Sequence, residues 1–414
     1  SVLKEQAGKA SEFSTGFSIL VPAFETREEF LRALINSVLA QTCGNWELIL
    51  ADASKTDRVS EVVKEYTDSR IRYHRLKENL GISGNTNEAL KTATGEYVAL
   101  LDHDDLLTED ALFECASVIE AYRKDNLELR MLYSDEDKCN SDGTLFYEVN
   151  RKPEFNLDLI LSNNYICHLL VMERELMQEL GFRSSVDGAQ DHDIILRAVD
   201  RMMGEDRHTA GKAGLPITHI PKVLYHWRCY EGSTSENPES KRYAYEAGKR
   251  AVEDFLKAPE YQADVVHTCH LGFFRVNYQP DLLSNRPDVA VVGGKLIDRH
   301  NRVVGGIYNE NREPLYLGLH REYSGYMHRA SCQQEAYAVD VRCMICSGEA
   351  QTVWEELTGL PYAVQPHTGY FLYQDVLKKD ADYEELSFRF CEELRRRGKR
   401  IVWDPEMVQR VDGR

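Results

Sequence analysis

Short apolar runs alternate with amphipathic stretches through the first hundred residues, and this alternation limits the possible folds more than any other feature. Four runs are typical of buried strands: FSILVPAF (17–24), WELILA (46–51), IRYHRL (71–76) and YVALLD (97–102). The stretches between them repeat apolar residues at helical spacing, as Phe30, Leu34 and Val38 do. Strands that alternate with helices predict an α/β fold with a parallel, doubly wound sheet.

The first helix carries start and stop signals. Thr26 and Glu29 stand at the spacing of a capping box, which predicts that the helix begins at Thr26. Gly44 is the residue expected to close it.

Polar residues follow three of the four apolar runs, at Ala23–Glu25, Asp52 and Asp102–Asp105. The carboxyl ends of parallel strands meet at one edge of a sheet, and ligands bind beyond that edge. The sequence therefore predicts a ligand site formed by these three segments.

An aspartate cluster, LLDHDDLL, forms the last of these segments and contains Asp102, Asp104 and Asp105. Three neighbouring carboxylates repel one another, so they must be solvated or must bind a cation. Oxygen ligands suit Mg2+ or Mn2+, which also bridge a diphosphate. A D-x-D pattern is common in solvated loops, but its position after the fourth strand favours a metal site.

Two later segments allow two interpretations each. In GAQDHDIILR, Asp191 and Asp193 stand at the start of a helix, where a carboxylate is either an ordinary cap or a general base. In VLYHWRCY, His226 beside Trp227 is either a buried, hydrogen-bonded histidine or an additional metal ligand.

The chain is long enough for two domains, or for one large domain with an appendage. We expect a polar lead at 1–16, a first domain at 17–278 and a different part at 281–414. Strand-like segments recur in that last part, but no aspartate cluster follows any of them. Cys343 and Cys346 interrupt one such segment, so we expect them to pack in a core without zinc or a disulfide.

The formal net charge of −18 excludes nucleic acid as a partner, since phosphate binding needs a basic face. No apolar run approaches the ~18–20 residues of a membrane span, and the N-terminal residues show no signal peptide. The ten cysteines are scattered, as in proteins with reduced thiols. These features predict a cytoplasmic protein, at most peripheral to the inner face of the membrane.

Seven segments follow one another in a distinctive order: SILVPAFE, WELILADASKTD, ENLGISGNTNEALKTATGEYVALLDHDD, YSDEDK, NYICHL, GAQDHDIILR and LYHWR. In this order, 17–278 resembles family 2 glycosyltransferases of the GT-A fold, especially bacterial enzymes that build cell-surface and O-antigen-type polysaccharides. The resemblance implies a GT-A-type, mostly parallel sheet. It also implies metal-dependent transfer of a sugar from a nucleotide-sugar with inversion at the anomeric carbon.

The resemblance implies roles for individual residues. Donor-binding positions are Pro22, Ala23, Phe24 and Glu25 against the nucleoside, Asp52 at the base, Asn79 and Gly81 near the diphosphate, and Asp102 with His103 at the ribose. Asp104 matches the metal ligand, His226 a histidine that completes the metal or diphosphate site, and Asp191 the catalytic base. Gln190 and Trp227 fall on the acceptor side.

Two positions depart from the family pattern. Ala53 stands where relatives have a second acidic residue after the second strand. Asn85 and Thr86 stand where many relatives have an arginine that contacts the donor. Both departures concern the choice of nucleotide and leave the metal and the base in place.

The C-terminal part has its own resemblance. RPDVAVVGGKLID, VDVRCMICSG and FCEELRRRGKRIVWDP resemble the later half of a second family 2 unit. The nucleotide-binding half with its D-x-D is missing, so we expect 281–414 to be a non-catalytic α/β half-domain. It would pack on the first domain or pair with a second copy as a homodimer.

The resemblance implies a hexosyltransferase with a UDP-sugar as the first choice of donor, dTDP-rhamnose as the second, and a glycan or lipid-linked acceptor. A sugar-phosphate nucleotidyltransferase would need a glycine-rich loop after the first strand, and VPAFETREEF has no glycine. A dinucleotide oxidoreductase would need G-x-G-x-x-G there. An inactive carbohydrate-binding or scaffold protein is the remaining alternative, and for 281–414 it is the preferred one.

Overall fold

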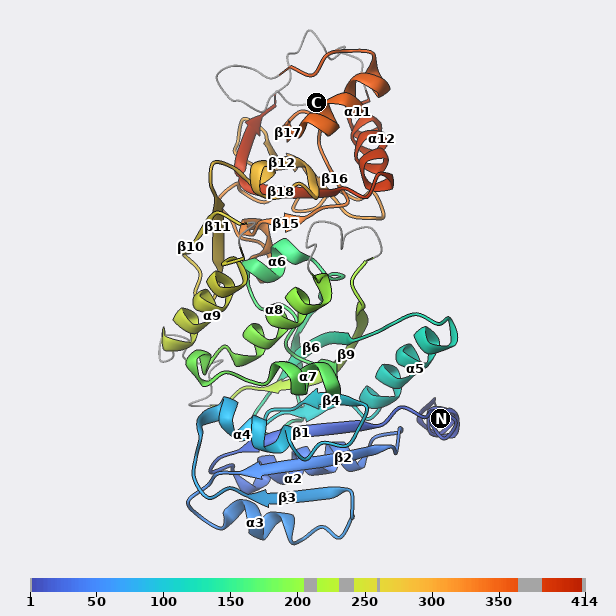
Figure 1. Cartoon of the computed structure of the whole chain (residues 1–414), viewed down its shortest axis with the longest axis vertical. Helices are drawn as coiled ribbons and strands as arrows, with labels where there is room; N and C mark the ends of the chain where they lie inside the picture. The colour runs from blue at the N-terminus through green and yellow to red at the C-terminus, as the bar shows by residue number, and fades with distance from the viewer. Residues whose placement is uncertain (1, 205–213, 231–241, 259–260, 364–381, 412–414) are drawn as a thin grey trace. The chain divides into compact units, whose positions relative to one another are not determined.

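The structure is a computed structural model that describes residues 2–204, 214–230, 242–258, 261–363 and 382–411. The chain divides into two compact units (Figure 1). The first unit contains 1–155, 164–202 and 216–252, and the second contains 156–163, 203–215 and 253–414. The boundary expected near 278–281 stays a prediction. Within the described residues, no helix is long and apolar enough to span a membrane.

The first unit contains the strands β1 (Phe17–Ala23), β2 (Trp46–Asp52), β3 (Ile71–Arg75), β4 (Tyr97–Leu100), β5 (Leu106–Leu107), β6 (Met131–Cys139), β7 (Phe146–Asn150), β8 (Leu170–Glu173) and β9 (Ile217–Arg228). Its helices are α1 (Val2–Ala10), α2 (Glu28–Leu39), α3 (Arg58–Val63), α4 (Gly81–Leu90), α5 (Ala111–Lys124), α7 (Arg174–Leu180), the 3-10 turn η1 (Ser184–Val186), and most of α8 (Gln190–Met203) and α9 (Arg242–Phe255).

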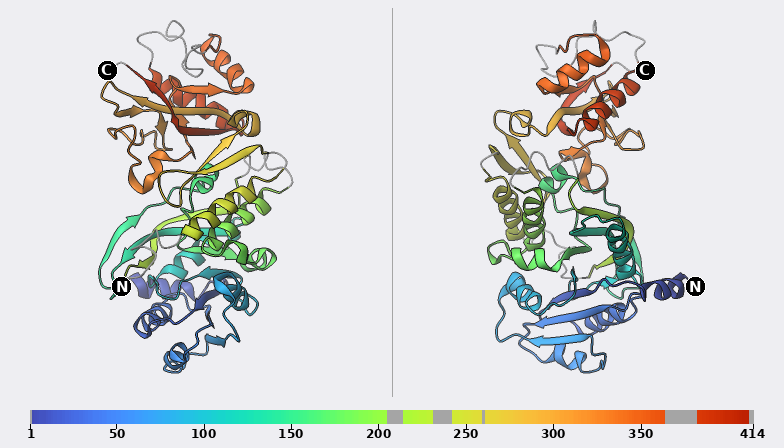
Figure 2. Two further views of the ribbon diagram at one scale, coloured as in Figure 1. Left: turned by 90° about the vertical axis from the view of Figure 1, so that its left-hand side faces the viewer. Right: turned by 45° about the vertical axis from the view of Figure 1, so that its right-hand side comes forward.

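These strands form one sheet in the order β3-β2-β1-β4-β8-β6-β9-β5, and β7 pairs with β6. The strands β3, β2, β1 and β4 are parallel neighbours and lie side by side in each view (Figures 1 and 2). β8 is antiparallel to both β4 and β6, whereas β9 is parallel to β6. The expected α/β class and the parallel, doubly wound start of the sheet are confirmed.

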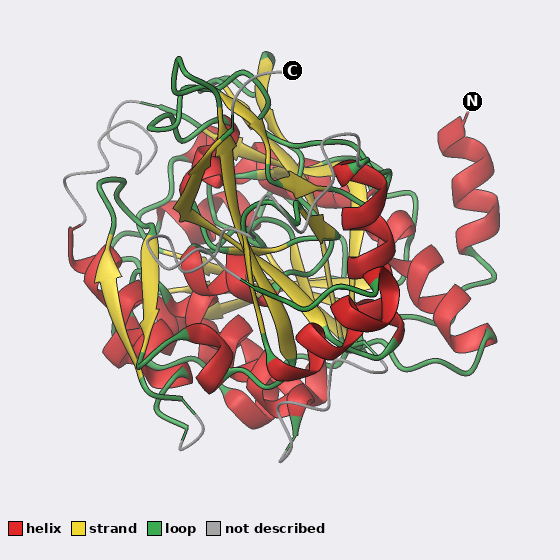
Figure 3. Cartoon of the chain, turned by 90° about the horizontal axis from the view of Figure 1, so that it is seen from above, coloured by secondary structure: helices red, strands yellow, loops and turns green. Residues whose placement is uncertain are grey.

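Helices cover both faces of the parallel strands. On one face, Ile19 and Val21 of β1 are fully buried against Leu31 and Leu34 of α2. On the other face, Leu20 points toward α4. Successive side chains on a strand alternate between faces, so the apolar run that marks β1 in the sequence serves two layers. At the N-terminus, α1 lies beside α5 (Figure 3).

The expected start of α2 is wrong. The helix begins at Glu28 with Arg27 as its N-cap, and no side chain caps it. The Thr26 hydroxyl instead forms a hydrogen bond with Nδ1 of His103, at 2.9 Å. A contact with the loop after β4 therefore replaces the local capping box.

The second unit contains α6 (Leu157–Ser162), β10 (Ala263–His267), β11 (Phe274–Tyr278), α10 (Leu282–Asn285), β12 (Val289–Ile297), β13 (Val303–Gly305), β14 (Ile307–Tyr308), the 3-10 segment η3 (Tyr326–Ser331), β15 (Gln334–Glu335), β16 (Ala338–Val339), β17 (Met344–Cys346), α11 (Gly348–Thr358), α12 (Tyr383–Arg396) and β18 (Arg400–Arg410). β11 pairs with β10 in a separate two-stranded sheet. Cys343 and Cys346 are buried, as expected.

The main sheet of the second unit repeats part of the first. Its central strand β12 pairs antiparallel with β13 and β17 and parallel with β18. β6 pairs in the same way with β7, β8 and β9. The two parallel pairs share an irregularity in register. From Gly293 to Lys295, an advance of two residues along β12 is matched by an advance of five residues along β18. From Ser134 to Glu136, an advance of two residues along β6 is likewise matched by five residues along β9.

Gly95 provides a test of this packing. A Cβ atom at Gly95 would lie 2.6 Å from the backbone carbon of Phe17 and 2.6 Å from the nitrogen of Ser18. We therefore expect Gly95→Ala to lower the free energy of unfolding by about 1–3 kcal/mol through overpacking, measured by denaturant titration. Gly8→Ala is the matched control, since no atom lies within 4 Å of a Cβ there. Equal stability of the two variants would contradict the close approach of β1 and Gly95.

Candidate functional site

The carboxyl ends of β1, β2 and β4 meet at one edge of the sheet. Ala23 is level with Asp52 in the parallel register, and the Ala53 amide donates to the Ala23 carbonyl at 2.9 Å. The Leu101 amide donates to the Leu20 carbonyl of β1 at 3.1 Å, which places the aspartate cluster directly beyond. The expected convergence of the three polar segments is confirmed.

The segment after β1 is held by its own hydrogen bonds. Glu25 has a φ of 49°, and its carboxylate accepts from the Lys55 amide and the Thr56 hydroxyl, each at 2.7 Å. These bonds, that from the Thr56 hydroxyl first, lower the pKa of Glu25. Phe24 beside it is 41% exposed. Contact of Pro22, Ala23, Phe24 and Glu25 with a nucleoside stays a prediction.

Asp52 is fully buried, and its carboxylate already has three partners. It accepts from the Ser54 amide at 2.9 Å and the Tyr73 hydroxyl at 2.7 Å, and it pairs with Arg75 at 3.1 Å. No role was expected for Tyr73 or Arg75 from the sequence. Arg75 is the residue of β3 that stands level with Asp52, so the strand register would have revealed it. A base that bonds to Asp52 would have to reach a carboxylate that is fully buried and already has these three partners.

Asn79 and Gly81 shape the start of α4. The Gly81 amide donates to Oδ1 of Asn79 at 3.0 Å. Gly81 has a φ of 76°, and a Cβ there would lie 2.4 Å from Oδ2 of Asp187, so only glycine fits. Thr86, one turn into the helix, lines the cavity described below.

Asp105 anchors the loop after β4. It is 1% exposed, and its carboxylate accepts from the Tyr225 hydroxyl at 2.5 Å and from the Arg228 amide at 2.8 Å. Burial, together with the charges of Asp104 and Asp102, raises the pKa of Asp105 well above its usual range. This buried carboxyl ties the aspartate loop to β9.

Asp104 and His226 lie in different surroundings. The Asp104 carboxylate accepts from the Tyr230 hydroxyl at 2.9 Å, whereas Nδ1 of His226 lies 2.5 Å from Oδ1 of Asp137. On β9, His226 stands between Tyr225 and Trp227, so its side chain is on the face of the sheet opposite to theirs.

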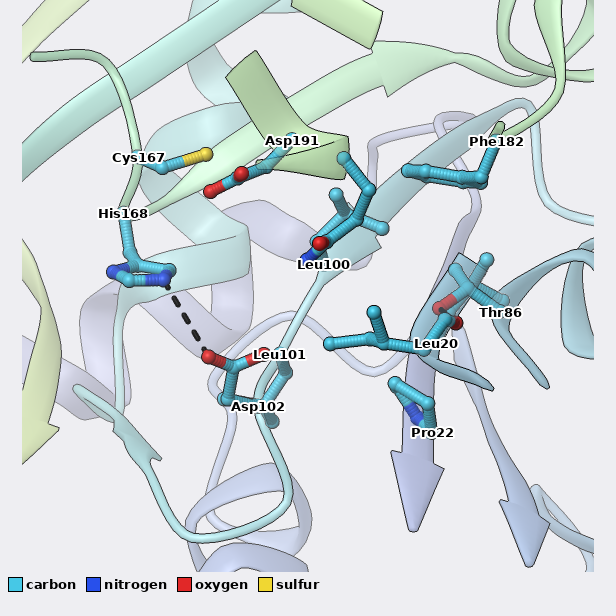
Figure 4. A pocket seen from close by; sticks show the side chains of 12 residues that line it. Leu20, Pro22, Thr86, Leu100, Leu101, Asp102, Cys167, His168, Phe182 and Asp191 are labelled. Carbon is cyan, nitrogen blue, oxygen red and sulfur yellow. Dashed lines mark hydrogen bonds and ion pairs between the residues drawn. The ribbon is translucent and has the colours of Figure 1, made fainter. Parts of the chain in front are cut away.

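A group with metal-binding geometry consists of Asp102, Asp105 and His168, whose ligand atoms lie within 4.8 Å of one another. Among the described residues, this is the one group of three or more such side chains with metal-binding geometry. Neither Asp104 nor His226 belongs to it. Nε2 of His168 lies 3.6 Å from Oδ2 of Asp102 (Figure 4). The roles expected for Asp104 and His226 stay predictions.

His168 stands between two carboxylates. Its Nδ1 lies 3.4 Å from Oε2 of Glu136, and its ring stacks on Tyr225 with a centroid distance of 4.6 Å. Burial by itself would lower the pKa of His168, but Asp102 and Glu136 raise it well above its usual range. The NYICHL and YSDEDK segments supply His168 and Glu136. They belonged to the sequence resemblance, but neither residue was assigned a role.

A buried lysine supports this arrangement. Lys152 donates to the carbonyls of Ile166 (2.8 Å) and His168, and its Nζ lies 3.6 Å from Glu136. Burial by itself would raise the pKa of Glu136, but the charges of Lys152 and His168 lower it to about 2. Glu136 is thus held between Lys152 and His168 inside the unit, and Lys152 fixes the backbone on both sides of Cys167.

Asp191 lies across a cavity from Asp102 (Figure 4). The cavity is lined by residues of β1, α4, the end of β4, the segment before β8, the segment after α7 and the start of α8: Leu20, Pro22, Ile82, Thr86, Leu100, Leu101, Asp102, Cys167, His168, Phe182, Gln190 and Asp191. Oδ1 of Asp191 accepts from the His192 amide at 2.9 Å. Asp193 is buried instead in ion pairs with Arg183 and Arg197, so the structure separates the two aspartates of GAQDHD.

Comparison with known proteins points to one family. Residues 18–181 match the family described as "Glycosyl transferase family 2". The chain is 41% identical over 243 residues to the uncharacterized protein y4gI of Sinorhizobium fredii, covering 58% of this chain and 25% of that protein. It is 30% identical over 282 residues to the O-antigen biosynthesis protein RfbC of Myxococcus xanthus, covering 66% and 20% respectively.

A third relative is the Escherichia coli protein named UDP-Glc:alpha-D-GlcNAc-diphosphoundecaprenol beta-1,3-glucosyltransferase WfgD. It is 30% identical over 166 residues, which are 40% of this chain and 63% of WfgD. This chain thus spans at most a quarter of the length of the first two relatives. Among solved structures, Staphylococcus aureus TarS 1-349 is 20% identical, with a TM-score of 0.44, covering 59% of this chain and 66% of that one.

The anchor at Asp105 can be tested through Tyr225. Tyr225→Phe removes a hydroxyl donor from a buried carboxyl, so we expect a loss of about 1–3 kcal/mol in the free energy of unfolding. Tyr66→Phe is the control, because the Tyr66 hydroxyl is more exposed and makes only long contacts at 3.3 and 3.5 Å. A Tyr225→Phe variant as stable as Tyr66→Phe would show that Asp105 does not anchor the loop.

Proposed function

We propose that this chain is a glycosyltransferase of family 2, whose model matches residues 18–181, and that it is an inverting, metal-dependent enzyme of the hexosyltransferase type. It transfers a sugar from a nucleotide diphosphate-sugar to a hydroxyl of a glycan or lipid-linked acceptor in polysaccharide synthesis. A UDP-sugar is the first choice of donor, in keeping with the name of WfgD, and dTDP-rhamnose is the second. The name of RfbC supports a role in a surface polysaccharide.

One observation carries the proposal. The carboxylates of Asp102 and Asp191 face one cavity from opposite sides, beyond the carboxyl ends of parallel strands. A transferase of this kind needs one acidic group where the diphosphate is held and another where the acceptor hydroxyl arrives. Apolar side chains, Leu20, Leu100 and Leu101 among them, also line this cavity.

Asp191 is the proposed base. It takes the proton from the acceptor hydroxyl as the oxygen forms its bond to the anomeric carbon. The bond from that carbon to the diphosphate breaks on the opposite face, and its electron pair leaves with the nucleotide. The His192 amide orients Asp191 by occupying one of its oxygens. A single displacement of this kind inverts the anomeric configuration.

Asp102, Asp105 and His168 fit a divalent ion such as Mn2+ or Mg2+, because two carboxylates and an imidazole converge within 4.8 Å. Such an ion supplies charge neutralisation for the leaving diphosphate. Lys152 and Glu136 hold His168 in position for this role. Asp104, suggested by the family resemblance, would add a carboxylate from the same loop.

The second unit is proposed to be non-catalytic. At matched positions of the repeated strands, Lys295 replaces Glu136 and Val408 replaces Tyr225. The pair Asp137 and His226 is replaced by Leu296 and Gln409. The scaffold of the acceptor half is thus kept while its charged groups are replaced. Packing on the first domain, or pairing with a second copy, stays the proposed role.

Metal dependence is tested by nucleotide binding. We expect UDP to bind with Mn2+ and to be released by EDTA. In His168→Ala, the affinity for UDP with Mn2+ should fall by roughly 10–100-fold. His226→Ala is the matched control, because its imidazole lies on the opposite face and pairs with Asp137.

The outcome separates two ligand sets. A loss of affinity in His226→Ala but not in His168→Ala would favour the set of Asp104 and His226 implied by the resemblance. UDP affinity that does not respond to EDTA would remove the metal from the proposal altogether.

The role of Asp191 is tested by turnover. In Asp191→Asn we expect kcat to fall by roughly 10²–10⁴-fold while UDP affinity is unchanged, since the base acts on the acceptor. Hydrolysis of a panel of UDP-sugars with Mn2+ supplies the assay until the acceptor is known. Turnover retained in Asp191→Asn would reduce this residue to a helix cap.

A further inference from the structure

A row of three side chains crosses the strands next to the candidate site. Lys138 of β6 is paired with Tyr147 of β7 on one side and with Trp227 of β9 on the other. Cross-strand partners share a face of a sheet, so the three side chains form one continuous row. Nζ of Lys138 lies 6.0 Å from the centroid of the Trp227 ring.

The row is accessible. Tyr147 is 36% exposed, and the Lys138 side chain is 31% exposed. Trp227 is half-buried, whereas the other tryptophans of the chain, Trp46, Trp354 and Trp403, are buried. In the first unit an indole is therefore partly exposed beside an exposed phenol, with a charged side chain between them.

The row lies on the same face as the candidate site. The Trp227 ring is 6.0 Å from the His168 ring, and His168 lines the cavity that contains Asp191. Phe146 precedes Tyr147 on β7 and contacts His226 on the opposite face, with the two ring centroids 4.2 Å apart. Strand alternation thus directs Trp227 and Tyr147 toward the site and Phe146 away from it.

We propose that Trp227, Lys138 and Tyr147 form the subsite that receives the pyranose ring of the acceptor, which rests on the proposed function. The flat faces of a pyranose ring carry C–H groups that pack on aromatic rings, and its rim carries hydroxyls. Lys138 and its ion-pair partner Glu148, at 2.5 Å, supply a donor and an acceptor for those hydroxyls.

The composition of the row favours a sugar over an apolar partner. An apolar surface placed on the row would bury Lys138 and Glu148 away from water without returning their hydrogen bonds, which is costly. A hydroxylated ring satisfies both groups while covering Trp227 and Tyr147. The subsite begins beside His168, so a hydroxyl of a ring bound there lies next to the cavity with the proposed base.

The experiment measures glycoside binding to the full chain by saturation-transfer NMR. The probes are methyl glycosides of glucose, galactose, N-acetylglucosamine, N-acetylgalactosamine and glucuronic acid, with UDP and Mn2+ present. We expect at least one glycoside to bind, and Trp227→Ala and Tyr147→Ala each to weaken it by roughly 2- to 10-fold. Trp227→Phe, which keeps a ring, should restore most of the binding.

Two controls make the result specific. Tyr323→Ala removes a 66% exposed tyrosine of the second unit and should leave glycoside binding unchanged. Affinity for UDP with Mn2+ should be the same in every variant. Binding that survives both Trp227→Ala and Tyr147→Ala, or the absence of binding by every glycoside, would overturn the subsite. Failure of the wild-type chain to bind UDP with Mn2+ would count against the proposed function instead, and the glycoside measurement could still be interpreted.

Discussion

The buried carboxyl of Asp105 is the contact on which the rest of the candidate site depends. It accepts hydrogen bonds from the Tyr225 hydroxyl and the Arg228 amide, and both donors belong to the end of β9. Burying a carboxyl is costly unless its oxygens are hydrogen-bonded, so the aspartate loop can adopt this position only when β9 is in place. The parallel half of the sheet, which ends in the loop, is thereby joined to the mixed half.

A second buried network sets the other side of the site. Glu136 lies between Lys152 and His168, and Lys152 also binds the backbone on each side of Cys167. Positive and negative groups alternate through this network, so each buried charge has a partner of opposite sign. His168 is consequently held between Glu136 and Asp102, at the edge of the cavity. The contact between Glu136 and His168 thus joins the YSDEDK and NYICHL segments.

The alternation of side chains between the two faces of a strand explains why some expected sites differ from the observed ones. His226 and Trp227 are neighbours in the sequence and were treated together, but alternation along β9 places them on opposite faces. His226 pairs with Asp137, whereas Trp227 borders His168. Similarly, Asp191 and Asp193 start the same helix, but only Asp191 lines the cavity. Short spacing in a sequence does not show which side chains share a surface.

The sequence by itself determined the alternation of strands and helices, the parallel start of the sheet and the polar segments at its carboxyl edge. These features depend on local periodicity and on the polarity of strand ends, which a single chain displays directly. The order of motifs likewise predicted the resemblance to family 2 glycosyltransferases, and the model of that family matches residues 18–181. The tertiary structure decided the partners: Arg75 beside Asp52, Tyr225 on Asp105, and His168 between two carboxylates. Each of these pairs joins residues from different strands or loops, and which of them meet depends on strand order and register, set only when the whole sheet packs.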